Sequence, residues 1–282
     1  MSGTGTLFLV STPIGNLGDM TPRGIELLKN ADLIAAEDTR NSIKLLNHFG
    51  IHTPMTAYHE FNRFDKADFL VSEMLSGKNV ACITDAGTPG ISDPGEVLVR
   101  KAVDAGIPVS AAPGASAAVT ALVISGLPTR RFRFEGFLPK EKKERKQVLS
   151  EVADGTATLV FYEAPHRLKE TLAVLLAALG DRQAAVCREL TKVHEQVMRC
   201  SLSEAVRFFE QEEPRGEYVL VIRGRDPEEL REEEQASWEA LSVPEHVAFY
   251  EAQGLDRKEA MKRAAKDRGV SKREIYAELI GQ

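Results

Sequence analysis

Three segments rich in glycine and proline have the residue types that hold small polar ligands. They span residues 11–19 (STPIGNLGD), 85–95 (DAGTPGISDPG) and 112–117 (APGASA). Glycine lets a backbone approach a ligand closely, proline fixes the shape of a loop, and the N–H groups that begin a helix are free to bind ligand atoms. The middle segment has eleven residues, whereas an ordinary loop between a strand and a helix has about 2–6. We therefore expect the three segments to share one binding site.

Polar residues at the ends of apolar runs are candidates for proton transfer. Each also fits an ion pair or a helix cap, and the sequence does not select among them. The motif G-x-x-x-x-G-K-S/T is absent, which excludes a P-loop nucleotide hydrolase, and no G-x-G-x-x-G follows the first apolar run, which disfavours a dinucleotide site. No His, Cys and carboxylate cluster has metal-ligand spacing, so we expect no metal. The candidate general bases are Glu37, Asp38, Asp85, Glu163, His166 and Lys192.

The first 126 residues alternate between strand-like and helix-like segments. Strands joined by helices form a mostly parallel sheet with helices on both faces, so an α/β fold is expected. Ligands bind beyond the carboxyl ends of such strands, where the three glycine-rich segments begin. Thr21 followed by Pro22 predicts the start of the first helix. The predicted strands span residues 6–11, 33–36, 80–84 and 109–112, and further helices span 42–49, 66–75, 95–105 and 115–124.

A second α/β series and a helical tail follow a boundary near Gly126–Arg131. We expect strands over 132–138, 158–162, 184–189, 195–200 and 217–222, with helices over 142–152, 167–178 and 203–209. The tail has an acidic connector and helices over 244–253, 257–267 and 271–279, the last two joined as in a helix-turn-helix. The predicted architecture is two α/β domains with a ligand cleft between them, plus a small all-helical C-terminal domain. The proposed bounds are 1–126, 127–225 and 226–282.

Composition indicates a globular protein of a reducing compartment. Apolar residues make up 43% and charged residues 28% of the 282 residues, and no apolar run approaches the roughly 20 residues that cross a bilayer. The N-terminal segment has no basic region typical of a signal peptide. Three scattered cysteines indicate free thiols rather than disulfides or a zinc site. We therefore expect a cytoplasmic protein with no membrane partner.

Charge is distributed unevenly along the chain. The net charge is −6, but residues 130–146 hold eight basic and three acidic residues, and residues 226–245 hold eight acidic residues and one arginine. Clustered cations can neutralise phosphates of nucleic acid. The alternation of Phe132, Phe134 and Phe137 within the basic segment indicates that these rings face the core. The candidate RNA-binding residues are Arg130, Arg131, Lys140, Lys142, Lys143 and Lys146, with Lys272 and Arg273 in the basic tail.

The glycine-rich segments also carry a family resemblance. The motifs TPIGNLGD (12–19), AEDTR (36–40), TDAGTPGISDPG (84–95) and APGASA (112–117), with FYEAPHR (161–167) and RGEYVLV (215–221), resemble in order and spacing the tetrapyrrole-methylase superfamily, the class III S-adenosylmethionine-dependent methyltransferases. The similarity covers roughly residues 5–224. A first loop of Thr12-Pro13-Ile14-Gly15 replaces the glycine-rich first loop of the porphyrinoid enzymes. That departure favours the branch of the superfamily that methylates ribosomal RNA.

The resemblance implies a function and a set of site residues. It implies S-adenosyl-L-methionine bound between the two domains and methylation of a cytidine ribose 2′-hydroxyl in the decoding region of small-subunit (16S) ribosomal RNA. It also implies the assembled 30S subunit as substrate and a homodimer. Glu163, His166 and Arg167 are expected to face the acceptor as catalytic residues. The expected cofactor-binding residues are Pro13, Asp85, Gly87, Thr88, Pro89, Ile91, Ser92, Ser116, Ala117, Tyr162 and Leu190.

Two other functions remain open from the sequence. A methyltransferase acting on a small molecule such as a porphyrinoid would need neither the basic segment nor the basic tail. A non-enzymatic RNA-binding factor of ribosome assembly would not need three converging glycine-rich loops. Binding of S-adenosylmethionine separates the enzymes from the pure RNA-binding factor.

Overall fold

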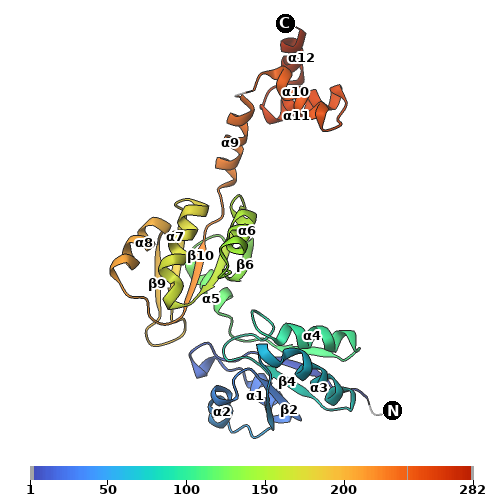
Figure 1. Cartoon of the computed structure of the whole chain (residues 1–282), viewed down its shortest axis with the longest axis vertical. Coiled ribbons are helices and arrows are strands. Elements are labelled where there is room, and N and C mark those ends of the chain that lie inside the picture. The colour runs from blue at the N-terminus through green and yellow to red at the C-terminus, as the bar shows by residue number, and fades with distance from the viewer. Residues whose placement is uncertain (1–2, 240, 281–282) are drawn as a thin grey trace. The chain divides into compact units, whose positions relative to one another are not determined.

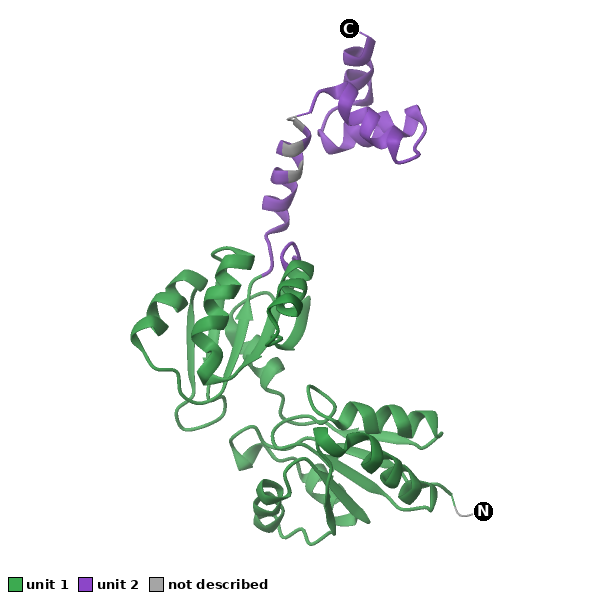
Figure 2. Ribbon diagram, viewed as in Figure 1, with its two compact units in different colours: residues 1–152, 157–223 green, residues 153–156, 224–282 purple. Residues whose placement is uncertain are grey.

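The computed structural model describes residues 3–239 and 241–280, which fall into two compact units. Unit 1 comprises residues 1–152 and 157–223, and unit 2 comprises residues 153–156 and 224–282 (Figure 2). Unit 1 contains two separate five-stranded sheets, whereas unit 2 is helical in its described residues (Figure 1). The fold is therefore α/β with a helical C-terminal part, as expected from the sequence. The further division of unit 1 at residue 126 stays a prediction.

The first sheet is wholly parallel, as predicted. Its strand order is β3-β2-β4-β1-β5. All four predicted strands are confirmed within one or two residues at each end, and the short β3, whose residues are all half-buried, was not predicted. The strands are β1 (Leu7–Val10), β2 (Leu33–Ala36), β3 (Met55–Ala57), β4 (Val80–Ile83) and β5 (Val109–Ala112).

Helices cover both faces of this sheet. Leu28 and Leu46 pack on one face, and Leu70 and Leu98 pack on the other. The Thr21 hydroxyl accepts a hydrogen bond from the Gly24 N–H, and Pro22 is the first helical residue, so the predicted helix start is confirmed. The helices are α1 (Pro22–Asn30), α2 (Thr39–His48), α3 (Arg63–Leu75), α4 (Gly95–Asp104) and α5 (Ala117–Ser125), with 3-10 turns η1 (Leu17–Asp19) and η2 (Glu60–Asn62).

The second sheet is mixed, with order β6-β7-β10-β8-β9. The strand that comes last in the sequence, β10, runs antiparallel to both of its neighbours. Its N-terminal end therefore lies beside the carboxyl ends of β7 and β8. Helix α5 packs on this sheet through Ala121 and Leu122. The strands are β6 (Phe132–Phe137), β7 (Thr158–Glu163), β8 (Gln183–Arg188), β9 (Gln196–Ser201) and β10 (Tyr218–Ile222); the helices are α6 (Lys142–Val152), η3 (Pro165–Arg167), α7 (Leu168–Leu179) and α8 (Leu202–Gln211).

Of the three phenylalanines of β6 that were expected to face the core, two are exposed, and a β-bulge lies between the second and the third. The pairing of β6 with β7 shifts register between Phe134 and Gly136, and Gly136 has a φ of 62°. An extra residue in a strand reverses the side-chain alternation beyond it. Phe134 is half-buried against Tyr162, whereas Phe132 and Phe137 are 47% and 50% exposed. The bulge thus places Phe137 on the same face as Phe134, where both rings contact Tyr162, and the Phe137 ring stays half-exposed at the carboxyl end of the strand.

Unit 2 has its own small core. Trp238 stacks on the fully buried His246, with ring centroids 4.1 Å apart and planes 4° apart. The acidic connector expected before the tail is itself a helix, since its glutamate-rich residues are good helix formers. No described helix has the length and apolar character required to cross a membrane. The helices are α9 (Pro227–Glu239), α10 (Val243–Ala252), α11 (Arg257–Asp267) and α12 (Lys272–Ile280), and the core residues are Val243, Val247, Ala260, Ala264, Ala265 and Ile275.

The substitution Ile275→Ala should destabilise unit 2. Ile275 is 1% exposed, whereas Ile280 on the same helix is 63% exposed. Removing the buried side chain leaves a cavity that costs about 2–5 kcal/mol of unfolding free energy. The chain has one tryptophan, and it lies in this unit, so its fluorescence during urea unfolding reports the loss. Ile280→Ala is the matched control, and equal midpoints for the two variants would contradict this packing.

Candidate functional site

The three glycine-rich segments touch one another at the carboxyl edge of the first sheet. Thr12 and Gly87 form an isolated bridge, with their N–H and C=O groups paired at 2.9 and 3.1 Å. The Thr88 hydroxyl lies 3.0 Å from that of Ser11 and donates to the Ala115 carbonyl at 3.1 Å. The loops after β1, β4 and β5 are therefore one hydrogen-bonded body, which is consistent with one shared site.

Two local features fix the shape of this body. The Asp93 carboxylate accepts hydrogen bonds from the N–H groups of Gly90, at 2.9 Å, and Gly95, at 2.7 Å, and so closes the middle loop on itself. Gly114 lies so close to the first loop that a Cβ on it would be 2.8 Å from the Cβ of Ser11. The loops thus meet backbone against backbone, with no room for an added methyl group.

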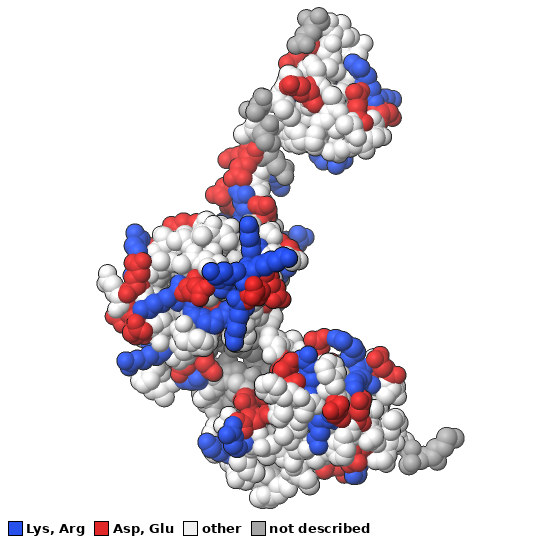
Figure 3. Space-filling view, viewed as in Figure 1, with Lys and Arg blue, Asp and Glu red and all other residues white. Residues whose placement is uncertain are grey.

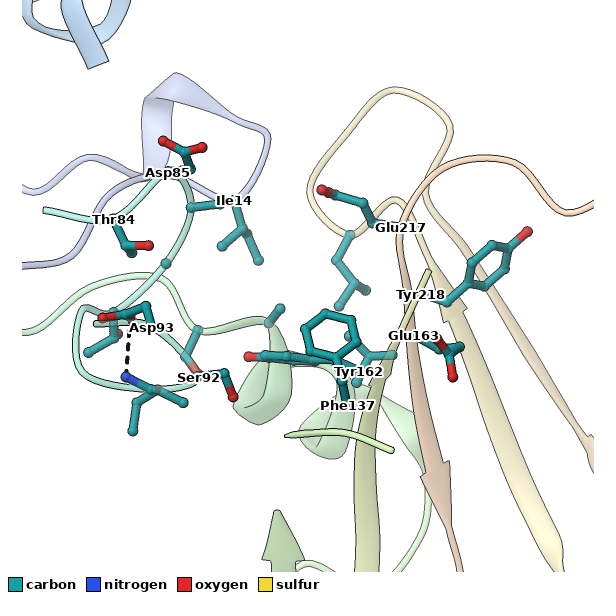
Figure 4. A pocket seen from close by; sticks show the side chains of 18 of the residues that line it. Ile14, Thr84, Asp85, Ser92, Asp93, Phe137, Tyr162, Glu163, Glu217 and Tyr218 are labelled. Carbon is teal, nitrogen blue, oxygen red and sulfur yellow. Dashed lines mark hydrogen bonds between the residues drawn. The ribbon is translucent and has the colours of Figure 1, made fainter. Parts of the chain in front are cut away.

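These loops and the second sheet enclose a cavity of about 540 Å³, here called the donor cavity. Its volume is typical of small-molecule sites. Figure 4 shows Thr84, Asp85 and Ile14 on one side and Phe137 and Tyr162 turned inward from the other. The lining residues are Ile14, Glu37, Thr84, Asp85, Ala86, Gly87, Thr88, Ile91, Ser92, Asp93, Ser116, Ala117, Phe137, Tyr162, Glu163, Ala164, Pro165, Leu190, Glu217, Tyr218 and Val219.

Most of the expected cofactor-binding residues line the donor cavity. The structure brings together Asp85, Gly87, Thr88, Ile91, Ser92, Ser116, Ala117, Tyr162 and Leu190. Two prolines do not belong to this set. Pro89 is buried within its loop, and Pro13 lines a neighbouring groove of about 340 Å³. We call this groove the α2 groove.

The far wall of the cavity is aromatic and charged. The rings of Phe137 and Tyr162 meet edge to face, with centroids 5.6 Å apart. The Lys192 ammonium pairs with Glu189 and Glu217, each at 2.9 Å, and its aliphatic stem lies against Gly15. The loop after β8 therefore packs on the loop after β1. Lys192, a candidate base, is committed to two carboxylates.

Of the three residues expected to face the acceptor, two are held by hydrogen bonds and one is exposed outside the lining of the donor cavity. Glu163 is 2% exposed, and its carboxylate accepts from the Thr171 hydroxyl at 2.5 Å and the Ala164 N–H at 2.8 Å. The Arg167 guanidinium donates to the Leu138 carbonyl at 2.7 Å. His166 is exposed and does not line the donor cavity. These contacts favour a structural role for Glu163 and Arg167, and Figure 4 shows the Glu163 carboxylate turned away from the cavity.

Carboxylates cluster on the wall that the first sheet forms, after β2 and β4. The Thr84 hydroxyl donates to Glu37 at 2.6 Å. Partial burial and the neighbouring charge of Glu37 raise the pKa of Asp85 above its ordinary value. The hydrogen bonds of Arg40 lower the pKa of Asp38 to about 2, and Asp38 also caps α2. Asp38 is thus a structural cap, whereas Asp85 is an exposed and unusually basic carboxylate.

Several lining residues were not identified as site residues from the sequence. Glu217, Tyr218 and Val219 reach the cavity because β10 runs antiparallel to its neighbours. Strand direction is a property of the assembled sheet and has no local signal. Phe137 reaches the cavity because of the bulge at Gly136. By contrast Ile14, Thr84 and Asp93 belong to the quoted loops and could have been included from their position alone.

A basic surface lies apart from the lining of the donor cavity. Lys and Arg side chains gather over α6 and β6 (Figure 3). Lys140, Lys142, Lys143 and Lys146 are exposed there, as are Arg130 and Arg131 before β6. In unit 2, Arg273 is exposed and Lys272 is half-buried. Within residues 3–239 and 241–280, no group of three or more His, Cys, Asp or Glu side chains is arranged to hold a metal ion.

Comparison with known proteins gives a consistent family and close relatives. The sequence pattern of the tetrapyrrole (corrin/porphyrin) methylases matches residues 6–206. A Halalkalibacterium halodurans protein named ribosomal RNA small subunit methyltransferase I is 52% identical over 96% of this chain and 93% of that protein. Proteins of the same name from Bacillus subtilis and Synechocystis sp. are 49% and 46% identical, covering 98% and 96% of this chain and 94% and 96% of their own lengths.

Solved structures share the fold at low sequence identity. A diphthine synthase aligns with a TM-score of 0.63 and 15% identity over 78% of this chain and 89% of its own. The uroporphyrin-III-C-methyltransferase of Thermus thermophilus aligns with a TM-score of 0.55 and 19% identity over 77% and 94%. At this level of identity the likeness concerns the fold alone.

The substitution Gly114→Ala should weaken binding in the donor cavity. The added methyl would meet Ser11 at 2.8 Å, so the first and third loops must separate, which costs about 1–3 kcal/mol. We expect a loss of S-adenosylmethionine affinity of about 5- to 150-fold by calorimetry, since 1.4 kcal/mol is about tenfold. Gly3→Ala is the control, because nothing lies within 4 Å of the added methyl there. Equal affinity of both variants would show that the loop contact does not shape the site.

Proposed function

The chain belongs to the tetrapyrrole (corrin/porphyrin) methylase family, and we propose that it transfers the methyl group of S-adenosylmethionine to small-subunit ribosomal RNA. The names of relatives at 46–52% identity over nearly the whole chain support this substrate. We further propose the ribose 2′-hydroxyl of a cytidine in the decoding region as the acceptor. The single observation that carries the proposal is the donor cavity, which three joined loops form beside several carboxylates.

The residues of the donor cavity fit S-adenosylmethionine. The apolar and aromatic side chains of Ile14, Leu190 and Tyr162 suit a purine. The N-terminus of α5 has an N-cap residue, Ser116, that makes no side-chain cap hydrogen bond, and such an end suits a carboxylate. Glu37 and Asp85 suit the positive sulfonium and ammonium groups. When bound, the cofactor supplies an electrophilic methyl carbon to the attacking ribose oxygen.

The chain must then accept the proton of the ribose hydroxyl. Five carboxylates line the donor cavity, and four are committed. Glu163 and Asp93 accept two or more hydrogen bonds each, Glu217 pairs with Lys192, and Glu37 accepts from Thr84. We propose Asp85, the fifth of these carboxylates, as the general base.

The contacts of Asp85 leave its carboxylate accessible. It accepts from the Asp38 N–H at 3.2 Å and from the Asn41 amide at 3.5 Å, both long hydrogen bonds. Its raised pKa makes the carboxylate a stronger base than an ordinary aspartate. Glu163, His166 and Arg167 remain candidates for the acceptor side, with less support from their contacts.

The wider setting of the substrate is also proposed. The exposed cations of α6 and β6 support contact with RNA phosphates. We propose the assembled 30S subunit as substrate, a homodimer as the active state and the cytoplasm as the compartment. The apolar face of α7 does not support the dimer, because Leu172 and Leu175 are fully buried. The exposed Val119 and Val123 of α5 are better candidates for a subunit contact.

Transfer of labelled methyl groups tests the proposed function. Unmodified small subunits incubated with the chain and labelled S-adenosylmethionine should acquire label on one ribose of the 16S RNA, and large subunits should not. Label on a porphyrinoid in place of RNA would favour the small-molecule enzyme. Binding to subunits without transfer to either acceptor would favour the assembly factor.

The pH dependence of the chemical step tests Asp85. A base must be ionised, so the rate falls as the pH drops through the raised pKa of Asp85. Asp85→Asn should lower the single-turnover rate by about 10²–10⁴-fold and abolish this acid limb. Glu37→Gln removes a neighbouring charge, lowers the pKa of Asp85 and moves the limb to lower pH.

The exposed Glu26→Gln on α1 is the matched control and should leave the limb unchanged. An acid limb that survives in Asp85→Asn would assign the proton transfer to another group.

A further inference from the structure

The α2 groove lies next to the donor cavity and has a distinct chemical character. Its volume is about 340 Å³. Asn41, Lys44, Leu45 and His48 recur at spacings of three and four residues, so they form one stripe along α2. The opposite stripe, with Ser42 and Leu46, is buried. The lining residues are Pro13, Gly15, Leu17, Asn41, Lys44, Leu45, His48 and Asp85.

Two polar side chains of the α2 groove are available to a ligand. Lys44 and His48 are exposed, and neither forms a salt bridge or side-chain hydrogen bond with the described part of the chain. The nearby Arg40 differs, since its guanidinium is held by Asp38 at 2.8 Å. A cation that has no internal partner is suited to an anionic group such as a phosphate.

The two cavities share one lining residue, Asp85. The carboxylate therefore stands at the junction between the donor cavity and the groove. A hydroxyl placed in the groove beside Asp85 would be close to both its base and its methyl donor. This continuity separates the α2 groove from the basic surface of α6 and β6, whose lysines and arginines line neither cavity.

We propose that the α2 groove holds the acceptor nucleotide, with Lys44 and His48 binding a phosphate of the RNA backbone. The ribose hydroxyl then lies beside Asp85, and its proton passes to that carboxylate as the oxygen attacks the methyl carbon and the sulfonium becomes a neutral thioether. Leu17, 44% exposed on the opposite wall, gives the unpaired base an apolar surface. The inference rests on the proposed function and adds the place where the RNA strand enters the site.

Charge reversal at Lys44 tests the groove in the full chain. With unmodified small subunits, Lys44→Glu should raise KM and weaken subunit binding without cofactor by about tenfold, because a charge-assisted phosphate contact is lost. The slope of log affinity against log salt should also fall by about one. S-adenosylmethionine affinity, measured by calorimetry, should stay unchanged. Lys44→Arg keeps the charge and should retain subunit affinity.

Lys29→Glu on α1 is the matched control, since Lys29 is exposed, lines neither cavity and changes charge equally. The proposal is overturned if Lys44→Glu binds subunits as tightly as Lys29→Glu does, or if its loss falls on S-adenosylmethionine affinity. If the unsubstituted chain methylates subunits while either of these results holds, the assignment of the groove is wrong and the proposed function stands. If the unsubstituted chain binds the cofactor but never methylates subunits, the proposed function is wrong and the groove assignment fails with it.

Discussion

The close approach of three backbone loops is the constraint on which the site depends. The loops after β1 and β4 are joined by the Thr12–Gly87 bridge, and the loop after β5 reaches them through Gly114 and the Thr88 hydroxyl. β1 lies between β4 and β5 in the sheet, so these loops emerge side by side. A ligand in the cavity therefore meets a rigid surface of peptide groups, and its affinity requires little ordering of the chain.

The hydrogen bonds around the cavity determine which carboxylates are free to accept a proton. Most carboxylates around the donor cavity hold the fold: Asp93 closes its loop, Glu163 ties β7 to α7, and Glu217 pairs with Lys192. The hydrogen bonds that Asp85 accepts from the described residues are long, at 3.2 and 3.5 Å, and Asp85 lies where the donor cavity meets the α2 groove. The arrangement separates the carboxylates that hold the fold from the one that we propose as the base. In this proposal the acceptor lies on the side of the first sheet, away from the residues of η3.

Much of the fold could be predicted because hydrophobic periodicity and helix-start signals act locally. The strands β2 and β5 and the helices α6 and α11 have the predicted bounds, and Thr21 caps α1 as its sequence indicates. Many residues that line the donor cavity could be predicted from the glycine-rich loops, because their residue types indicate ligand binding. Features set by strand pairing could not be predicted from the sequence: the bulge at Gly136 placed Phe137 on the face of Tyr162, and the antiparallel course of β10 brought Glu217 to the site. The orientation of Glu163 was likewise decided by a partner, Thr171, eight residues away.

A crystal structure of the chain with S-adenosylhomocysteine and a short cytidine-containing RNA would show directly whether the three loops hold the cofactor. We expect the nucleoside between the glycine-rich loops and Tyr162, with Asp85 within hydrogen-bonding distance of a ribose hydroxyl and a phosphate against Lys44. A nucleoside bound outside the donor cavity, or an acceptor ribose approaching from η3 and remote from Asp85, would contradict it.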